Sequence, residues 1–231
     1  MQIKLSELVD VGAIRNKVRE ELGMNEAYVV QAPPVEMQTE LLSSKSQLIL
    51  KNLVNMYAEE LNHVSAELEG ASRDLAMPDA SRYVALKAQE GRLLQLSFLL
   101  GLHITNIGDP QSLLTMDSLS YMRIERDFGT FDSWQKDFIA CAMGSMRFAV
   151  TAYSLELRRY INLIVDDNHP LPPSIIPVIS LAVMPQLYVR DYLDDRKSYV
   201  FAMMKELNWN SVENRVKRAE KCAAAYEGRP Q

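Results

Sequence analysis

A pair of long helical segments in the first half of the chain constrains its fold more than any other feature. Residues 35–68 contain no glycine or proline, so nothing there interrupts a helix. Pro78 marks a turn, and a second helical segment covers residues 80–107, which Gly108 and Pro110 bring to an end. Two long helices joined by a short connection pack antiparallel. The sequence therefore predicts a long antiparallel helical hairpin.

The second half of the chain has the pattern of a small sheet. Three stretches rich in β-branched and aromatic residues are separated by turn signals, at residues 147–154, 160–165 and 175–184. The helices predicted around them cover residues 133–143, 188–193, 198–207 and 211–225. This order indicates an α+β fold, in which an N-terminal long antiparallel helical hairpin is followed by a small three-stranded antiparallel sheet flanked by helices.

Three parts are predicted along the chain. Residues 1–34 form an N-terminal extension, with an amphipathic helix over residues 6–23 where apolar residues recur at helical spacing. Residues 35–118 form the helical hairpin domain, and residues 119–231 form an α/β domain with C-terminal helices. The apolar face of the extension needs a surface to cover it, on this chain or on a neighbouring one.

Charge and cysteine content argue against several classes of function. A net charge of −5 does not suit a broad basic surface that grips nucleic acid, although it is compatible with a small local basic patch. Cys141 and Cys222 form no Cys-x-x-Cys pair, which argues against a zinc knuckle or a redox dithiol. No apolar segment approaches the roughly 20 residues that span a bilayer, and acidic residues near the N-terminus do not suit a targeting peptide. We therefore expect a globular protein without a membrane span.

Several motifs of the chain occur in a characteristic order. The run 188–199 (YVRDYLDDRKSY) is followed by Leu207-Asn208-Trp209, and the run 127–132 (DFGTFD) lies upstream of both. Lys45 and Asn55 occupy matching places in the first helical segment. Together these motifs resemble the iron/manganese superoxide dismutases, in order and spacing, from about residue 35 to residue 219.

This resemblance implies where a metal ion would be held. Enzymes of the family bind one iron or manganese ion through three histidines and one aspartate, ligands that suit these metals. The residues at the corresponding positions are Leu42, Leu100, Ala182 and Gln186. Near them, Leu50 stands in place of a tyrosine, and Pro185 in place of a glutamate that links two subunits. The resemblance thus implies a degenerate site with no catalytic, cofactor-binding or metal-ligating residue, and we expect the four side chains to pack together.

Other candidate sites carry weaker signals. Of the three histidines, only His103 lies within a helical turn of an expected ligand position; one ligand does not make a metal site, and whether His103 serves a residual site stays open. Asp166 and Asp167 are adjacent carboxylates, but acids in a turn are usually solvated, whereas catalysis needs a pocket. Basic residues that could touch phosphates mix with acids, as on a solvated helix face: Arg158, Arg159, Lys217, Arg218 and Lys221.

A family member that has lost its ligands is expected to be kept for its surface. By analogy with superoxide dismutase-like proteins of mitochondrial ribosomes, we expect a non-catalytic structural subunit of a large assembly, first of all the mitochondrial ribosomal small subunit. Its partners would be other protein subunits, among them a second superoxide dismutase-like chain in a heterodimer, with peripheral ribosomal RNA contact left open. Three alternatives remain: a scaffold subunit of a respiratory complex, a regulatory partner of an active dismutase, and an active dismutase with rearranged ligands.

Overall fold

The computed structural model describes residues 39–74, 76–78, 81–107 and 112–227. In this range the chain forms two compact units, which are described separately: residues 58–93 make up the first, and residues 39–57 with residues 94–227 make up the second. The helix predicted over residues 6–23 lies outside the described residues. The predicted part boundaries after residues 34 and 118 stay a prediction.

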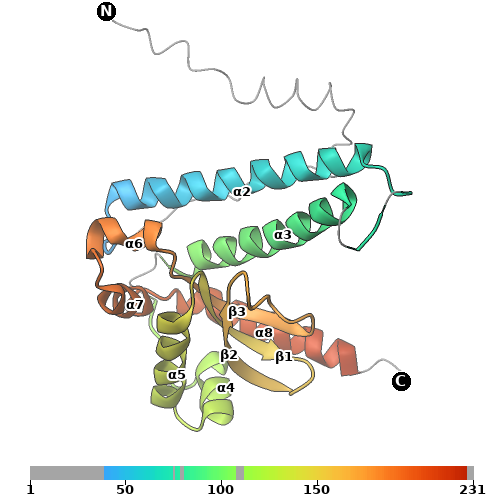
Figure 1. Cartoon of the computed structure of the whole chain (residues 1–231). Helices are drawn as coiled ribbons and strands as arrows, with labels where there is room; N and C mark the ends of the chain where they lie inside the picture. The colour runs from blue at the N-terminus through green and yellow to red at the C-terminus, as the bar shows by residue number, and fades with distance from the viewer. Residues whose placement is uncertain (1–38, 75, 79–80, 108–111, 228–231) are drawn as a thin grey trace, which may run out of the picture. The chain divides into compact units, whose positions relative to one another are not determined.

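The first unit contains the end of α2 (Ser44–Gly70), the beginning of α3 (Arg82–Asn106) and the connection between them (Figure 1). The contacts between the two helices run in opposite order along them. Gln89 Nε2 donates a hydrogen bond to Glu60 Oε1 at 3.0 Å, and Arg82 forms an ion pair with Glu67. The antiparallel helical hairpin is therefore confirmed within this unit.

The first long helix begins later than the sequence predicts. Residues 39–43 are not helical, and α2 starts at Ser44 rather than at residue 35. Side chains of the C-terminal half hold this entry segment: Tyr192 Oη donates to Leu41 O at 2.9 Å, and Asp191 Oδ2 accepts from Ser43 N at 2.9 Å. Because these backbone groups bond to distant partners, they are not free to form a helical turn.

The second unit contains a three-stranded antiparallel sheet with the order β2-β1-β3. Its strands are β1 (Phe148–Ser154), β2 (Arg159–Val165) and β3 (Ile175–Ala182). All seven residues of the central strand β1 are buried, so the strand needs cover on both of its faces. The pairing of β1 with β3 shifts by one residue between Thr151 and Ala152. The predicted α+β fold and its small sheet are confirmed.

Five helices accompany the sheet in the described part of this unit: α4 (Leu119–Phe128), α5 (Phe131–Gly144), α6 (Pro185–Tyr192), α7 (Arg196–Lys205) and α8 (Trp209–Glu227). The last four were predicted with shifted ends, whereas α4 was not predicted. Gly129 ends α4 with a φ of 83°, a conformation that favours glycine. Thr130 then begins α5, because its side chain accepts a hydrogen bond from Ser133 N.

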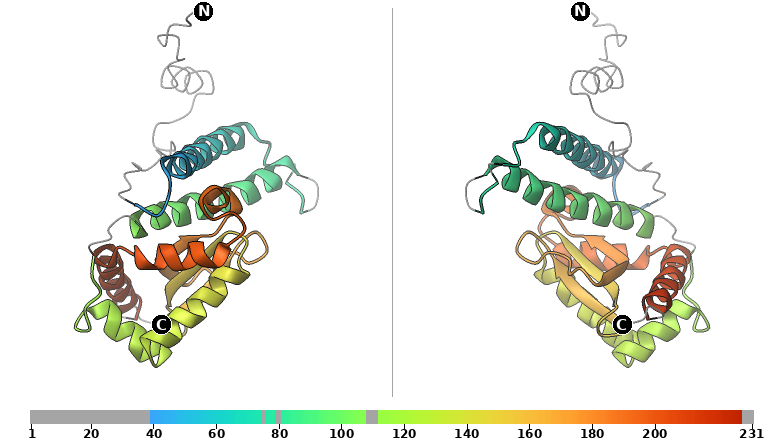
Figure 2. Two further views of the ribbon diagram at one scale, coloured as in Figure 1. Left: turned by 90° about the vertical axis from the view of Figure 1, so that its left-hand side faces the viewer. Right: turned by 90° about the vertical axis from the view of Figure 1, so that its right-hand side faces the viewer.

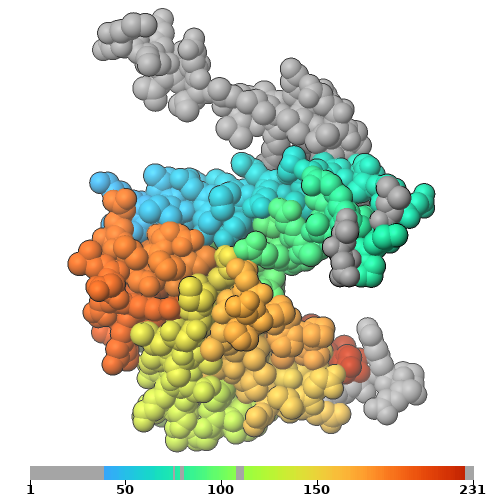
Figure 3. Space-filling view, in the orientation of Figure 1, coloured from blue at the N-terminus to red at the C-terminus, as the bar shows by residue number. Residues whose placement is uncertain are grey.

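The core of the second unit lies where these helices meet the sheet. α5 packs against β1 and β2, and α8 packs against β3. Figure 2 shows α4 and α5 side by side next to the strands, and Figure 3 shows the same elements as a continuous packed surface. The large side chains of Trp134, Phe138 and Tyr199 are fully buried here. Within the described residues, no helix has the length and apolar character needed to cross a membrane.

Candidate functional site around His103

Three of the four sequence-predicted site residues are buried in the second unit. Leu42 lies in the bend before α2, Leu100 lies on α3, and Ala182 ends β3. Leu100 and Ala182 have no exposed surface, and Leu42 is 4 % exposed. The side chains of leucine and alanine carry no donor or acceptor atom. These positions thus contribute apolar packing and no coordinating group.

The fourth residue, Gln186, behaves differently. Gln186 lies in the first turn of α6 and is exposed, as is Pro185 before it, whereas Leu187 and Tyr188 of the same helix are buried. The expectation that all four side chains pack together is therefore wrong for Gln186. The reason is local: α6 begins at Pro185, and its first turn directs positions 185 and 186 to solvent while the next two residues face the core. Gln186 Nε2 lies 3.7 Å from the sulfur of Met184.

His103, on α3, is a buried polar residue of the same unit. The side chain has no exposed surface, and neither ring nitrogen has a hydrogen-bond partner among the described residues. Burial lowers the pKa of His103 to about 4, and the nearby Ser180 backbone opposes this shift without cancelling it. The Ser180 carbonyl accepts its hydrogen bond from Asn106 Nδ2 at 3.2 Å. His103 is therefore a neutral imidazole at pH 7.

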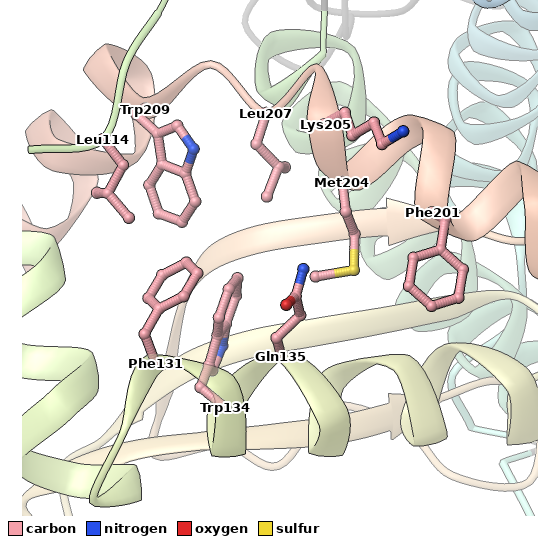
Figure 4. A pocket seen from close by; sticks show the side chains of 9 residues that line it. All are labelled: Leu114, Phe131, Trp134, Gln135, Phe201, Met204, Lys205, Leu207 and Trp209. Carbon is pink, nitrogen blue, oxygen red and sulfur yellow. The ribbon is translucent and has the colours of Figure 1, made fainter.

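A pocket of about 250 Å³ lies elsewhere in the second unit, between α5 and the end of α7 (Figure 4). Aromatic rings form one side of it: the ring centroids of Phe131 and Trp134 are 4.8 Å apart, and those of Trp134 and Trp209 are 5.9 Å apart. The lining residues are Leu114, Phe131, Trp134, Gln135, Phe201, Met204, Lys205, Leu207 and Trp209. The lining holds no carboxylate, histidine or cysteine, so it suits an apolar group and offers no general base.

The comparisons with known proteins agree with this architecture. The profile of the family described as "Iron/manganese superoxide dismutases, C-terminal domain" matches residues 117–215, which run from before α4 into α8. Residues 117–215 are therefore similar to the C-terminal domain of the iron/manganese superoxide dismutases. This confirms the resemblance found in the sequence.

Individual relatives extend the match toward the N-terminus. The chain is 27 % identical over 181 residues to a superoxide dismutase [Fe] of Cupriavidus metallidurans, covering 76 % of this chain and 89 % of the relative. It is 27 % identical over 174 residues to a superoxide dismutase [Fe] of Aquifex pyrophilus, covering 73 % and 78 %. A superoxide dismutase [Mn] 1 of Halobacterium salinarum is 31 % identical over 99 residues, which is 42 % of this chain and 49 % of that one.

The donor atoms of the described residues do not fit the ion of a superoxide dismutase. Within the described residues, no group of three or more His, Cys, Asp or Glu side chains could hold a metal ion. His103 lies one helical turn from Leu100 on α3. His169 lies in a turn, where its Nδ1 is 2.8 Å from Asp166 Oδ1, and His63 belongs to the other unit, where it lies 2.8 Å from Glu67. No redox step can therefore be assigned to these side chains.

The carboxylates Asp166 and Asp167 do not work as a catalytic pair. Asp167 Oδ2 accepts hydrogen bonds from Arg147 Nε and Nη2, at 3.0 and 2.7 Å. Burial raises the pKa of Asp166, but hydrogen bonds from His169 and from backbone amides outweigh it, so the net pKa is lowered. Asp166 is buried at 6 % exposed, so the expectation of a solvated acid is wrong for this residue. Its Oδ1 accepts hydrogen bonds from the backbone N–H groups of Asn168 and His169, which shapes the turn.

Sequence reasoning missed the polar network that adjoins His103. Asn106 is fully buried on α3, and its Oδ1 accepts a hydrogen bond from Arg215 Nη1 of α8. Only one signal in the sequence pointed to this region: Arg215 and Arg218 are three residues apart in a predicted helix and therefore share a face. The partner of Arg215 comes from a different helix and follows only from the tertiary structure.

Proposed function

We propose that this chain is a non-catalytic member of the superoxide dismutase family that serves as a structural subunit of a large assembly. The observation that carries the proposal is the apolar filling at Leu42, Leu100 and Ala182, within an otherwise retained family fold. An emptied metal site would leave polar groups unsatisfied, which is costly in a core. Replacement by apolar residues avoids that cost and leaves the outer surface as the functional part.

The first candidate for the assembly is the mitochondrial ribosomal small subunit, and the location would then be mitochondrial. This choice rests on analogy with superoxide dismutase-like ribosomal proteins. Sucrose-gradient sedimentation of a mitochondrial lysate, with the chain tagged, tests it. We expect the chain in the ribosomal fractions at high Mg²⁺, and in the small-subunit fraction after chelation of Mg²⁺ has separated the subunits.

Two other outcomes of this gradient would contradict the ribosomal assignment. If the chain sediments with a respiratory complex, and its position does not depend on Mg²⁺, it is a scaffold subunit of that complex and not of the ribosome. A chain found only in a small free pool would remove the scaffold role altogether.

Within the assembly, we propose a second superoxide dismutase-like chain as the direct partner, in a heterodimer. Pro185 and Gln186 are exposed at the start of α6 and are available for such a contact. Substitution of both by aspartate should reduce co-purification of the partner. Lys217→Asp is the matched control because Lys217 is exposed on α8, and it should leave co-purification unchanged. Equal loss in both variants would point to a general charge effect.

An active dismutase with rearranged ligands is the alternative, since the relatives are named superoxide dismutases and His103 is an unpaired imidazole. Purified chain should be assayed after incubation with Fe²⁺ and with Mn²⁺. Activity that depends on the metal and disappears in His103→Leu would support this alternative and overturn the non-catalytic proposal.

A further inference from the structure

Arg215 on α8 is a half-buried cation whose hydrogen bonds within the described part of the chain all go to neutral groups. Its Nη1 donates hydrogen bonds to Asn106 Oδ1 and, at 3.2 Å, to the carbonyl of Val178 on β3. Its Nη2 donates to Thr105 Oγ1 at the end of α3. The guanidinium thus lies where α3, β3 and α8 come together, next to the exposed Thr105.

None of the described carboxylates compensates this charge. Burial and, to a lesser extent, the positive charge of Arg218 together lower the pKa of Arg215 to about 10, with no acidic group acting in the opposite direction. The acids nearest in sequence on α8 have other partners: Glu213 Oε1 lies 3.2 Å from Lys217 Nζ, and Glu220 forms a two-pronged pair with Arg123. A partly buried cation without a counter-charge is costly, so an anion bound beside it is favourable.

Arg218 adds a second guanidinium one turn along the same face of α8. Its side chain is exposed, and no described carboxylate forms an ion pair with it. Two guanidinium groups present several N–H donors to one region, which suits an oxyanion with several acceptor oxygens. The Thr105 hydroxyl donates instead to carbonyls of its own helix, Gly101 O and Leu102 O, both at 3.0 Å. A phosphate group carries a charge of about −1.5 to −2 at pH 7, which matches two arginines better than a single carboxylate does.

We propose that Arg215 and Arg218 form a binding site for a phosphate group. This site is independent of the assembly proposed above, because it rests only on the folded second unit. Both donors are on α8, and Arg215 is held in place by Asn106 of α3 and Val178 of β3, so the site is formed when these elements pack. It also assigns a role to Arg218, a residue that the sequence alone places on a solvated face.

A structural alternative is that Arg215 only clamps α3 and β3 to α8. Substitution of Arg215 would destabilise the protein under either hypothesis, so it does not distinguish them. Arg218 makes no such clamp and can be replaced with little effect on the fold. The matched control is Lys217, which is the next residue back on α8, is exposed, and carries the same charge.

The test measures phosphate binding to the purified full-length chain by calorimetry and by thermal unfolding at constant ionic strength, with chloride as the reference anion. We expect phosphate to raise the Tm of the natural chain. Arg218→Gln should weaken phosphate binding roughly tenfold, the effect of losing one charge-assisted hydrogen bond, at unchanged Tm in chloride. Lys217→Gln should bind phosphate as the natural chain does.

Three results would overturn the proposal. The first is no phosphate response in the natural chain. The second is an equal loss of binding in Arg218→Gln and Lys217→Gln, which would reflect net charge alone. The third is an equal response to acetate, which would show a general anion site rather than a phosphate site.

The source of the phosphate is identified in the same assay. A short single-stranded RNA that competes with inorganic phosphate, and loses affinity in Arg218→Gln, would show that the site accepts backbone phosphates. An RNA that does not compete would show that the site accepts free phosphate.

Discussion

Trp134 Nε1 donates a hydrogen bond to Thr151 Oγ1 at 2.9 Å, at the position where the pairing of β1 with β3 shifts by one residue. Thr151 Oγ1 donates in turn to Asn162 Oδ1 at 2.6 Å, and Asn162 Nδ2 donates to the carbonyl of Trp134 at 3.2 Å. The three residues form a closed network that ties α5 to β1 and β2. The threonine hydroxyl accepts and donates within this network, so no apolar residue of the same shape can replace it.

Thr151→Val should therefore destabilise the second unit. Valine keeps the volume of threonine but leaves the buried indole N–H unsatisfied, at a cost of about 1–3 kcal/mol. Denaturation with urea, followed by tryptophan fluorescence, measures the change. Trp134→Phe combined with Thr151→Val removes the donor too, and the double variant should lose less than the sum of the single ones. Strict additivity would show that the hydrogen bond contributes nothing.

His103 predicts a particular pH dependence of stability. The pKa of His103 is about 4 in the folded protein, against 6.5 for a histidine in the unfolded chain. Between these two pH values the unfolded state therefore binds more protons than the folded state does. Stability contributed by neutral His103 is fully present above pH 6.5, falls as the pH falls toward 4, and amounts to about 3 kcal/mol at most. Unfolding free energies at pH 7 and pH 4.5 should differ less in His103→Leu than in the natural chain. An equal difference would contradict the burial of an unpaired ring.

The metal content of the natural chain and of one variant tests the non-catalytic proposal. Elemental analysis of the purified chain should find far less than one iron or manganese per chain. Gln186→His should not change this, because Leu42, Leu100 and Ala182 contribute no donor and position 186 is exposed. A stoichiometric metal in the natural chain would contradict the proposal. Metal that appears only in the variant would show that position 186 reaches the core after all.

The start of α4 should depend on two side chains. Ser118 Oγ accepts from Tyr121 N, and the Glu213 carboxylate of α8 accepts from Leu119 N and Ser120 N. Ser118→Ala should cost about 1 kcal/mol, measured by urea denaturation. Thr115→Ala is the control, because the Thr115 side chain is exposed and lies outside the helix. A loss of equal size in both variants would show that the cap is not responsible.

The part of the fold that the sequence predicts well is set by local pattern. The strands are rich in β-branched and aromatic residues, and glycine or proline marks the ends of the long helices; most of these ends agree with the structure to within a few residues. The missing helix α4 shows the limit, because its start is held by Glu213, about 90 residues later in the chain. The late start of α2 has the same origin, since Asp191 and Tyr192 hold the segment before it.

The candidate site also has features that the sequence predicts and others that depend on tertiary structure. The burial of Leu100 and Ala182 follows from their places on apolar elements, and the structure agrees. The exposure of Gln186 could not be inferred, because it depends on the turn at which α6 begins. The surroundings of Arg215 depend on three elements that only the tertiary structure brings together.

The central position of β1 has a consequence for how the second unit opens. Both edges of this strand are paired, and every one of its residues is buried. Its ladder amides reach solvent only when β2 or β3 separates from it, which requires helices to leave the sheet as well. Amide hydrogens in β1 should therefore exchange with deuterium only through the rare, complete opening of the unit, and their exchange rates report its global free energy.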